Sequence, residues 1–185
     1  LDYVRAHQGE LGLVAADLDE LEVDSYVSAH SGTTHVTVWQ LRGGVRVRTG
    51  LMQVNVARDG SIINLHHQFV GNLDAAAEGG DWVELSAIDA VVAAAADLGL
   101  QLTEALTVVE PERGPARGTV LSGGGIAIES IPARLVYEPS QKGGMTLAWA
   151  LEIAEVGQRH HWLVQVDART GAVLSREDLV VHEDF

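Results

Sequence analysis

The pattern of apolar and polar positions predicts few helices and many short strands. Apolar residues recur at helical spacing over residues 1–13, which predicts an opening helix, and a short helical turn is expected over 15–21. A later helix has defined ends. Ser86 with Asp89 three residues on is a capping-box signature, and Gly99 supplies the C-terminal cap. The residues between these caps are therefore expected to be helical.

Alternation of apolar with other residues predicts strands over most of the remaining chain. The clearest case places Leu147, Trp149, Leu151 and Ile153 on one face of a strand. Each predicted helix precedes a run of strands, which is typical of an α+β fold with helices packed on one face of antiparallel sheets. The expected extended segments are residues 23–41, 45–48, 51–56, 61–65, 126–130, 133–137, 145–154, 161–166 and 172–180.

Two hairpins of similar sequence suggest an internal repeat. Residues 54–63 and 164–174 each place an Asp- and Gly-containing turn between short apolar strands. In both turns a glycine, Gly60 or Gly171, supplies the positive φ that a tight hairpin needs. Each hairpin also lies downstream of a predicted helix. The sequence therefore favours two related helix-then-sheet units in tandem.

The boundary between the two units is expected near residue 72. Residues 72–81, NLDAAAEGGD, are small, polar and glycine-containing, as in a linker or a long loop. A second loop is expected over residues 110–118, which contain two prolines and two glycines. We therefore predict an N-terminal unit over 1–72 and a C-terminal unit over 73–185.

The tryptophans are expected to divide by role. Trp39, Trp149 and Trp162 lie in alternating segments, so each is expected to be at least half buried. Trp82 lies between the two units, and we expect it to pack across their junction.

Composition narrows the classes of function. The 185 residues are 46% hydrophobic, which is enough for a core, and carry a net charge of −14. This charge argues against nucleic acid and anionic membrane surfaces as partners. No apolar run approaches the length of a membrane span, and there is no cysteine for a disulfide or a thiol nucleophile. The chain has no initiator Met, so we expect it to be part of a longer or processed product.

Catalytic signatures are missing. The sequence has no H-E-x-x-H zinc motif and no G-x-S-x-G nucleophile elbow. The sole lysine, Lys142, lies in a predicted solvated loop. We therefore expect no catalytic residue, no cofactor and no metal site in this chain.

Histidine pairs are poor candidates for metal ligands. In His66–His67 and His160–His161 the two neighbours would point to opposite faces of a strand, so neither pair could close on one ion. His182, Glu183 and Asp184 offer three possible ligands at the extreme C-terminus, on a segment that we expect to be flexible.

Two charged clusters have competing explanations. The acidic run over residues 17–24 lacks the glycine and terminal Glu of a calcium loop, so a solvated surface is expected. Arg42, Arg46 and Arg48 could form a patch that faces carboxylates of a partner. They could equally form a charged edge that prevents sheet-to-sheet aggregation. The sequence leaves both explanations of the arginines open.

Two stretches of the sequence resemble known propeptide modules. The first is similar to the fungalysin/thermolysin propeptide module at His35, Val36, Gln40, Gly44, Val45, Val47, Val54, Val56, Asp59, Gly60 and Ile62. The second is similar to the propeptide-and-YpeB module at Trp149, Leu151, Trp162, Val164, Val166, Asp167, Thr170, Gly171, Val173 and Leu174. Between them, residues 131–139, IPARLVYEP, resemble the connecting region of fungalysin-type precursors.

This resemblance implies a secreted zinc metalloendopeptidase made as an inactive precursor. Its propeptide would consist of two tandem cystatin-like units that inhibit the catalytic domain and assist its folding. The partner would be that catalytic domain, which would hold the zinc and begin just after Phe185. His182, Glu183 and Asp184 would then be the candidates for contact with its cleft. Where the family carries Pro and an aromatic residue, this chain has Arg46 and Arg48. Contacts of this hairpin with the catalytic domain would then be electrostatic or displaced.

An alternative is a free-standing secreted peptidase inhibitor or an envelope protein-binding module. An enzyme in its own right is the least supported class, because nothing in the chain activates a nucleophile or a water. An H-E-x-x-H motif encoded downstream in the same gene would distinguish the propeptide from the free-standing module.

Overall fold

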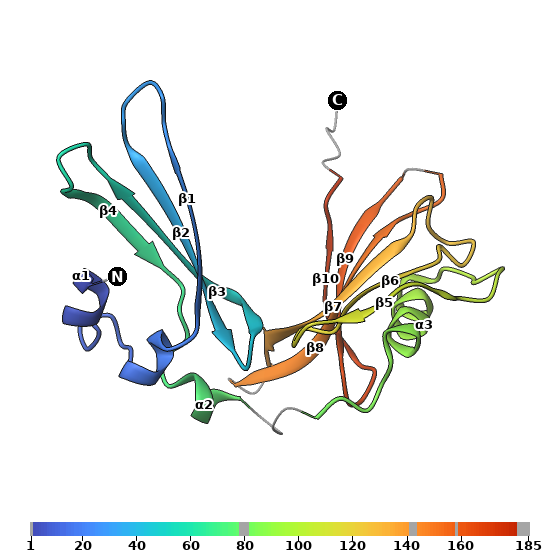
Figure 1. Cartoon of the computed structure of the whole chain (residues 1–185). Coiled ribbons are helices and arrows are strands. Elements are labelled where there is room, and N and C mark those ends of the chain that lie inside the picture. Colours follow the sequence, from blue (N-terminus) through green and yellow to red (C-terminus); the bar gives the residue numbers. More distant parts are fainter. Residues whose placement is uncertain (1, 78–81, 141–143, 158, 181–185) are drawn as a thin grey trace.

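The computed structural model describes residues 2–77, 82–140, 144–157 and 159–180. Within these ranges the strands join in one mixed but mainly antiparallel sheet, which opens into two wings in Figure 1. The few helices are α1 (Asp2–Ala6), a 3-10 turn η1 (Ala15–Leu18), α2 (Leu73–Ala76) and α3 (Ala87–Leu98). The strands are β1 (Leu21–Val27), β2 (Thr34–Arg42), β3 (Val45–Val56), β4 (Ile62–His67), β5 (Val108–Arg113), β6 (Gly118–Leu121), β7 (Ile131–Pro139), β8 (Met145–Ala154), β9 (His161–Asp167) and β10 (Val173–Asp178). The predicted α+β class is confirmed at this level, and tandem cystatin-like units stay a prediction.

The N-terminal wing is an antiparallel sheet in the order β1-β2-β3-β4. The short segments α1 and η1 lie against one face of it (Figure 1). Apolar residues of β2 and β3 point to this face at alternate positions, as period-2 patterning requires. The buried core they form is small: Val4, Leu13, Leu18, Val38, Met52 and Phe69.

The predicted opening helix is much shorter than expected. It ends at Ala6, and turns follow over residues 7–12. Gly9 and Gly12 interrupt the helical pattern, and Gly12 adopts a φ of +71° that a helix does not contain. Val4 and Leu13 are nevertheless buried, so the apolar spacing correctly identified the residues that face the sheet.

The C-terminal wing carries the larger core. Its sheet runs β5-β6-β7-β8-β9-β10, and α3 packs against the last three of these strands. Trp149 is completely buried at the centre of β8, where its indole N–H donates to the carbonyl of Leu85 at 2.9 Å. The predicted caps of α3 are confirmed: the Ser86 hydroxyl accepts from the N–H of Asp89, and Gly99 has a φ of +70°. Helix α3 and the sheet thus enclose an apolar core that is centred on Trp149.

The two wings join through β3 and β7. These strands are parallel, and the register pairs Val47 with Tyr137. Val45 and Val47, at the start of β3, belong to the core of the C-terminal wing, whereas Met52 in the same strand belongs to the N-terminal core. One strand therefore contributes to both cores, and the domain boundary near residue 72 stays a prediction.

Two predicted segments are wrong. Residues 110–118, expected as a loop, belong mostly to the hairpin of β5 and β6. The expected strand over 126–130 is instead a turn with one isolated bridge at Ala127. Gly124 and Gly125 have φ values of +58° and +77°, and the N–H of Ile126 bonds back to the Gly123 carbonyl at 3.0 Å. A turn of this kind consumes the hydrogen bonds that a strand would need.

Four smaller expectations also have outcomes. The segments 45–48 and 51–56 form one strand, β3, rather than two. Trp39 and Trp162 are mostly buried, as predicted. Trp82 is 71% exposed, so its predicted packing across the junction is wrong. The acidic run is not uniformly solvated either, because Asp17 is buried.

Candidate functional site

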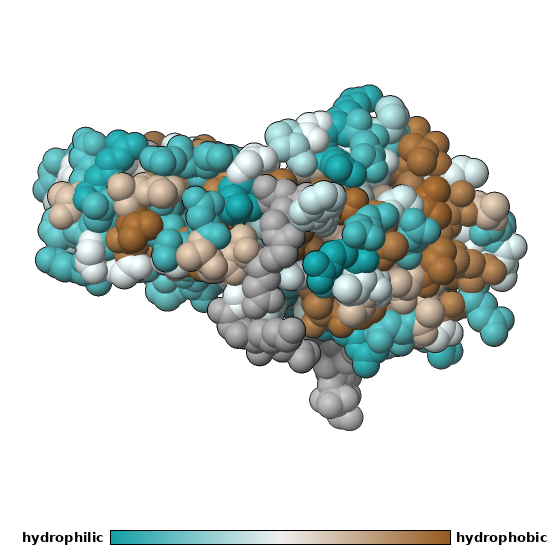
Figure 2. Space-filling view, turned by 90° about the horizontal axis from the view of Figure 1, so that it is seen from below, coloured by the Kyte–Doolittle hydropathy of each residue, from teal (hydrophilic) through white to brown (hydrophobic). Residues whose placement is uncertain are grey.

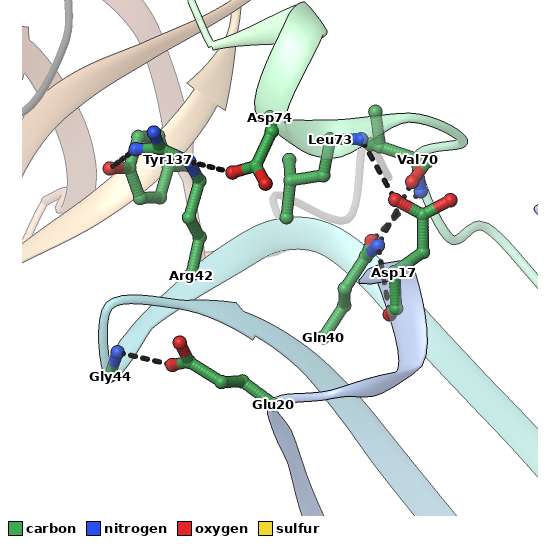
Figure 3. Close-up of polar contacts among 9 residues, drawn as sticks. All are labelled: Asp17, Glu20, Gln40, Arg42, Gly44, Val70, Leu73, Asp74 and Tyr137. Carbon is green, nitrogen blue, oxygen red and sulfur yellow. Dashed lines mark hydrogen bonds and ion pairs between the residues drawn. The ribbon is translucent and has the colours of Figure 1, made fainter. Parts of the chain in front are cut away.

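The junction between the wings concentrates the buried polar groups of the chain. Its first element is Asp17 at η1, which is only 4% exposed. The carboxylate accepts hydrogen bonds from the backbone N–H groups of Val14, Asn72 and Leu73, each at 2.8 Å. Figure 3 shows the bond from Leu73. A buried carboxylate is tolerated when it is fully hydrogen-bonded in this way. Asp17 therefore fixes the start of α2 against the N-terminal wing.

Gln40 in β2 is the second element, and it is completely buried. Its side-chain amide donates to the carbonyl of Val70 and accepts from the N–H of the same residue, both at 2.9 Å. The Gln40 side chain thus bonds to the backbone of Val70 as a neighbouring strand would, and it holds the segment that leads to α2. Figure 3 shows Gln40 and Asp17 side by side beneath that segment.

Arg42 at the end of β2 reaches the other wing. Its Nε lies 2.8 Å from a carboxylate oxygen of Asp74 in α2, and one terminal nitrogen donates to the hydroxyl of Tyr137 in β7 at 2.6 Å. The guanidinium also lies 5.4 Å from the centre of the Tyr137 ring. Because Tyr137 is buried in the C-terminal core, Arg42 ties the β2–β3 hairpin to that core (Figure 3).

Arg46 pairs within the N-terminal wing. It donates to both carboxylate oxygens of Glu22 in β1, at 2.8 and 2.5 Å, and it lies 4.4 Å from the centre of the Trp39 ring. The hydrogen bond from Arg46 lowers the pKa of the Glu22 carboxyl below its usual value. A bidentate pair stacked on an aromatic ring is well ordered even near a surface.

Arg48 pairs across the junction. It donates through two nitrogens to the carboxylate of Glu138 in β7, which is only 3% exposed. The same carboxylate accepts from the hydroxyl of Ser175 in β10 at 3.1 Å. The hydrogen bond to Glu138 raises the pKa of Arg48 above its ordinary value, so the guanidinium stays charged.

The predicted arginine patch is thus occupied within the chain. Arg42, Arg46 and Arg48 each face a carboxylate of the same molecule. They lie on β2 and β3, inside the sheet order rather than at its edge. Their predicted contact with a partner stays a prediction.

The histidine pairs separate as expected. His66 lies opposite Gln53, while its neighbour His67 packs edge-on against Phe69. His160 and His161 likewise bond to different carboxylates, those of Asp178 and Glu152, at 2.6 and 2.8 Å. Within the described residues, no group of three or more His, Asp or Glu side chains could hold a metal ion.

Asp178 anchors the end of β10. Besides His160, its carboxylate accepts from the backbone N–H groups of His161 and Val180, each at 3.1 Å. The hydrogen bond from His160 holds the pKa of Asp178 far below its usual range, and the backbone donors add to that effect. The candidate contact residues His182, Glu183 and Asp184 lie outside the described residues.

Two grooves mark the sheet surfaces. The larger, of about 340 Å³, lies over β6–β9, on the side of the sheet where Ala150, Glu152 and Arg134 alternate with core residues. The second, of about 220 Å³, is apolar and lies between α1 and the N-terminal sheet. In Figure 2, which views the molecule from below, apolar surface gathers over the C-terminal wing and polar surface over the N-terminal wing.

Comparison with known proteins gives related sequences but no family assignment. No family model matches the chain. An extracellular metalloproteinase of Leptosphaeria maculans is 30% identical over 151 residues, which are 80% of this chain and 23% of that protein. One of Aspergillus niger is 26% identical over 166 residues, 88% of this chain and 25% of that protein. The chain is similar to one part of extracellular metalloproteinases.

The similarity is limited in extent. The chain spans about a quarter of the length of the curated relatives it matches. Among solved structures, the C-terminal domain of Bacillus megaterium YpeB aligns with 97% of this chain and 62% of that chain, at 14% identity and a TM-score of 0.43. None of the helices in the described part of the chain is long and apolar enough to cross a membrane.

Sequence reasoning missed the acceptors of the junction. Asp74 was placed in a linker, and Glu138 was noted only as part of the motif IPARLVYEP. One signal was present: Glu138 follows three apolar residues in a strand, and a carboxylate in such a run needs a cation or several donors. The partner itself could not be named, because β3 and β7 are far apart in sequence.

Proposed function

We propose that this chain is the propeptide region of an extracellular metalloproteinase precursor, which inhibits the catalytic domain and assists its folding. The observation that carries the proposal is the similarity of most of the chain to about a quarter of each of two fungal extracellular metalloproteinases. In finer terms, the two wings would be a fungalysin/thermolysin propeptide-like unit followed by a propeptide-and-YpeB-like unit, each cystatin-like.

The chemistry of the chain fits a binding role. In the part of the chain that the structure describes, side chains form ion pairs and hydrogen bonds but none is an activated nucleophile, and Arg42, Arg46 and Arg48 form pairs within the chain. The zinc would be held by the catalytic domain, which is not part of this chain. Sheet edges such as β1 and β10 present unpaired backbone groups, which peptidase clefts recognise by strand addition.

Inhibition in trans tests this proposal. The mature peptidase from the same precursor is assayed with a peptide substrate while the purified chain is added. We expect inhibition that saturates at one chain per peptidase, because a propeptide must occupy the cleft with defined stoichiometry. The Arg176→Gln variant serves as a control, since it breaks only the exposed pair with Asp97. Full activity at a large molar excess of the folded chain would contradict the proposal.

A second assay addresses the C-terminal tail. His182, Glu183 and Asp184 could approach the zinc and displace its catalytic water. Removal of residues 180–185 should then weaken inhibition several-fold without unfolding the chain, because among the described contacts it removes only the bond from the Val180 N–H to Asp178. If the shortened and the full chain inhibit equally, the folded wings, and not the C-terminal tail, block the active-site cleft of the peptidase.

A further inference from the structure

The backbone pairing between the wings is narrow, although Val45 and Val47 also pack in the C-terminal core and Arg42 bonds to Tyr137. Across the sheet, the register of β3 and β7 contains one parallel pair, Val47 with Tyr137. Beside this pair the strand β3 is irregular: Trp39 lies opposite Leu51, but Leu41 lies opposite Arg46, so the residues between them bulge out of register. Bulges let a strand bend. Strand β3 is therefore bent where the two wings meet.

One charged pair, Arg48 with Glu138, connects β3 and β7 at this bend. Its arginine is partly exposed and its carboxylate is buried. Arg48 follows the parallel pair on β3, and its side chain is 36% exposed, whereas that of Glu138 on β7 is 3% exposed. Separation of the wings would leave the Glu138 carboxylate buried without its cation. Such an unpaired buried charge is strongly unfavourable, which opposes any opening that breaks the contact.

Glu138 is also braced from behind by the C-terminal wing. The Ser175 hydroxyl lies within hydrogen-bond distance of both Glu138 and the Gln165 side chain, but it has only one hydrogen to donate. Gln165 is 2% exposed, and as oriented its Nε2 has no hydrogen-bond partner. With this amide rotated, Gln165 donates to the Ser175 oxygen, and the Ser175 hydroxyl is free to donate to Glu138. The hydrogen bond from Ser175 therefore helps to fix the Glu138 carboxylate on β7, where Arg48 balances its charge.

We propose that Arg48 and Glu138 form a latch that sets the angle between the two wings, with Ser175 and Gln165 as positioning residues behind the carboxylate. When the latch is closed, the two wings present their open faces at one fixed angle. When it is broken, the wings pivot about the irregular part of β3. This inference does not depend on the proposed function.

The absence of cysteine from the sequence makes the angle measurable, because introduced cysteines are the sole sites for spin labels. Ser31 at the tip of the N-terminal wing and Glu129 in the C-terminal wing are both exposed. Pulsed dipolar spectroscopy on the doubly labelled full chain reports the distribution of distances between them. We expect a single narrow distribution for the parent chain.

The decisive variant is Arg48→Met, which keeps much of the apolar stem but removes the charge. We expect its distance distribution to be at least about twice as broad as that of the parent. Arg176→Met is the matched control: it removes an arginine paired with Asp97 inside the C-terminal wing and should leave the distribution unchanged. Exchange of the two charges, Arg48→Glu with Glu138→Arg, should narrow the distribution again.

A conservative variant keeps the test decisive if Arg48→Met does not fold. Arg48→Lys retains the charge but loses the two-nitrogen geometry, so we expect an intermediate width. Near-ultraviolet circular dichroism, to which Trp149 contributes together with the other aromatic side chains, verifies that each variant keeps its packed tertiary structure. Distributions as narrow as the parent's in folded Arg48→Met or folded Arg48→Lys would overturn the latch.

Discussion

The two wings of this molecule reach their folds by different means. The C-terminal wing encloses apolar residues between α3 and the face of its sheet, with Trp149 completely buried at the centre. The N-terminal wing has a short α1 over its sheet, and Val23, Val27 and Ile62 remain substantially exposed. Apolar burial contributes roughly 25 cal/mol per Å², so the two cores differ greatly in the stabilisation they supply.

Because the N-terminal core is the smaller one, the polar contacts of the junction matter more for the stability of the N-terminal wing. The N-terminal wing is stabilised less by its own core and more by specific contacts at its base, namely those of Asp17, Gln40 and Arg42. Contacts of this kind depend on geometry and fail together when one partner is lost. The C-terminal wing should therefore tolerate changes at the junction better than the N-terminal wing does.

The largest predicted effect is in the C-terminal core. Trp149→Ala should cost about 3–5 kcal/mol, because it leaves a large cavity and removes a donor from the carbonyl of Leu85. Trp39→Ala, which removes the ring beneath Arg46, should cost only about 1–2 kcal/mol. Chemical denaturation of both variants measures the two values. Equal losses would contradict the proposed inequality of the wings.

Next in size is the buried carboxylate of the junction. Asp17→Ala leaves three backbone N–H groups without their acceptor, so we expect a loss of about 2–4 kcal/mol. Asp19→Ala, two residues along, should change stability by less than about 0.5 kcal/mol. Hydrogen exchange should further show that Asp17→Ala speeds exchange in β1 and β2 more than in β8. A uniform increase over all strands would refute the assignment of Asp17 to the N-terminal wing.

A smaller effect is expected at the turn between β2 and β3. Gly43 and Gly44 both have positive φ, at +56° and +72°, so alanine is strained at either position. A Cβ at Gly43 would meet nothing, but one at Gly44 would lie 2.7 Å from a ring carbon of Pro115 on the other wing. Gly44→Ala should therefore cost roughly 1–2 kcal/mol more than Gly43→Ala. Identical melting temperatures would show that the wings are not in contact at this turn.

The smallest effect is a dependence of stability on pH. The folded pKa of Asp178 lies below its unfolded value of about 4, so its contribution is fully present above that pH and is lost as the pH falls below it. Asp178→Asn should lower the melting temperature at pH 6, and the gap to the parent should shrink below about pH 4. Glu129→Gln controls for the change in net charge. A gap that stays constant down to about pH 2.5 would contradict the assigned role.

The sequence predicts local features well and long-range pairs poorly. The caps of α3, the positive φ of Gly60 and Gly171, and the inward face of β8 follow from local patterns and were confirmed. The hairpin of β5 and β6 was missed because Pro and Gly inside it are typical of a loop, although one Pro in an edge strand leaves the pairing intact.

The junction illustrates why the candidate site was harder to predict than the fold. Asp17 lies within an acidic run that is typical of a solvated surface, and nothing local distinguishes it from Asp19. Its burial results from the approach of residues 72 and 73, which are distant in sequence. The partners of Arg42 and Arg48, likewise, are determined by how β7 docks beside β3.

The most direct test of the central claim is the sequence of the full-length transcript that encodes this chain. If the chain is the propeptide region of a metalloproteinase precursor, the same open reading frame should encode an H-E-x-x-H motif within roughly 300 codons downstream of Phe185. The encoded segment should also contain a further zinc-ligating residue C-terminal to that motif. A reading frame that continues without such a motif, or that stops shortly after Phe185, would contradict the account and favour a free-standing binding module.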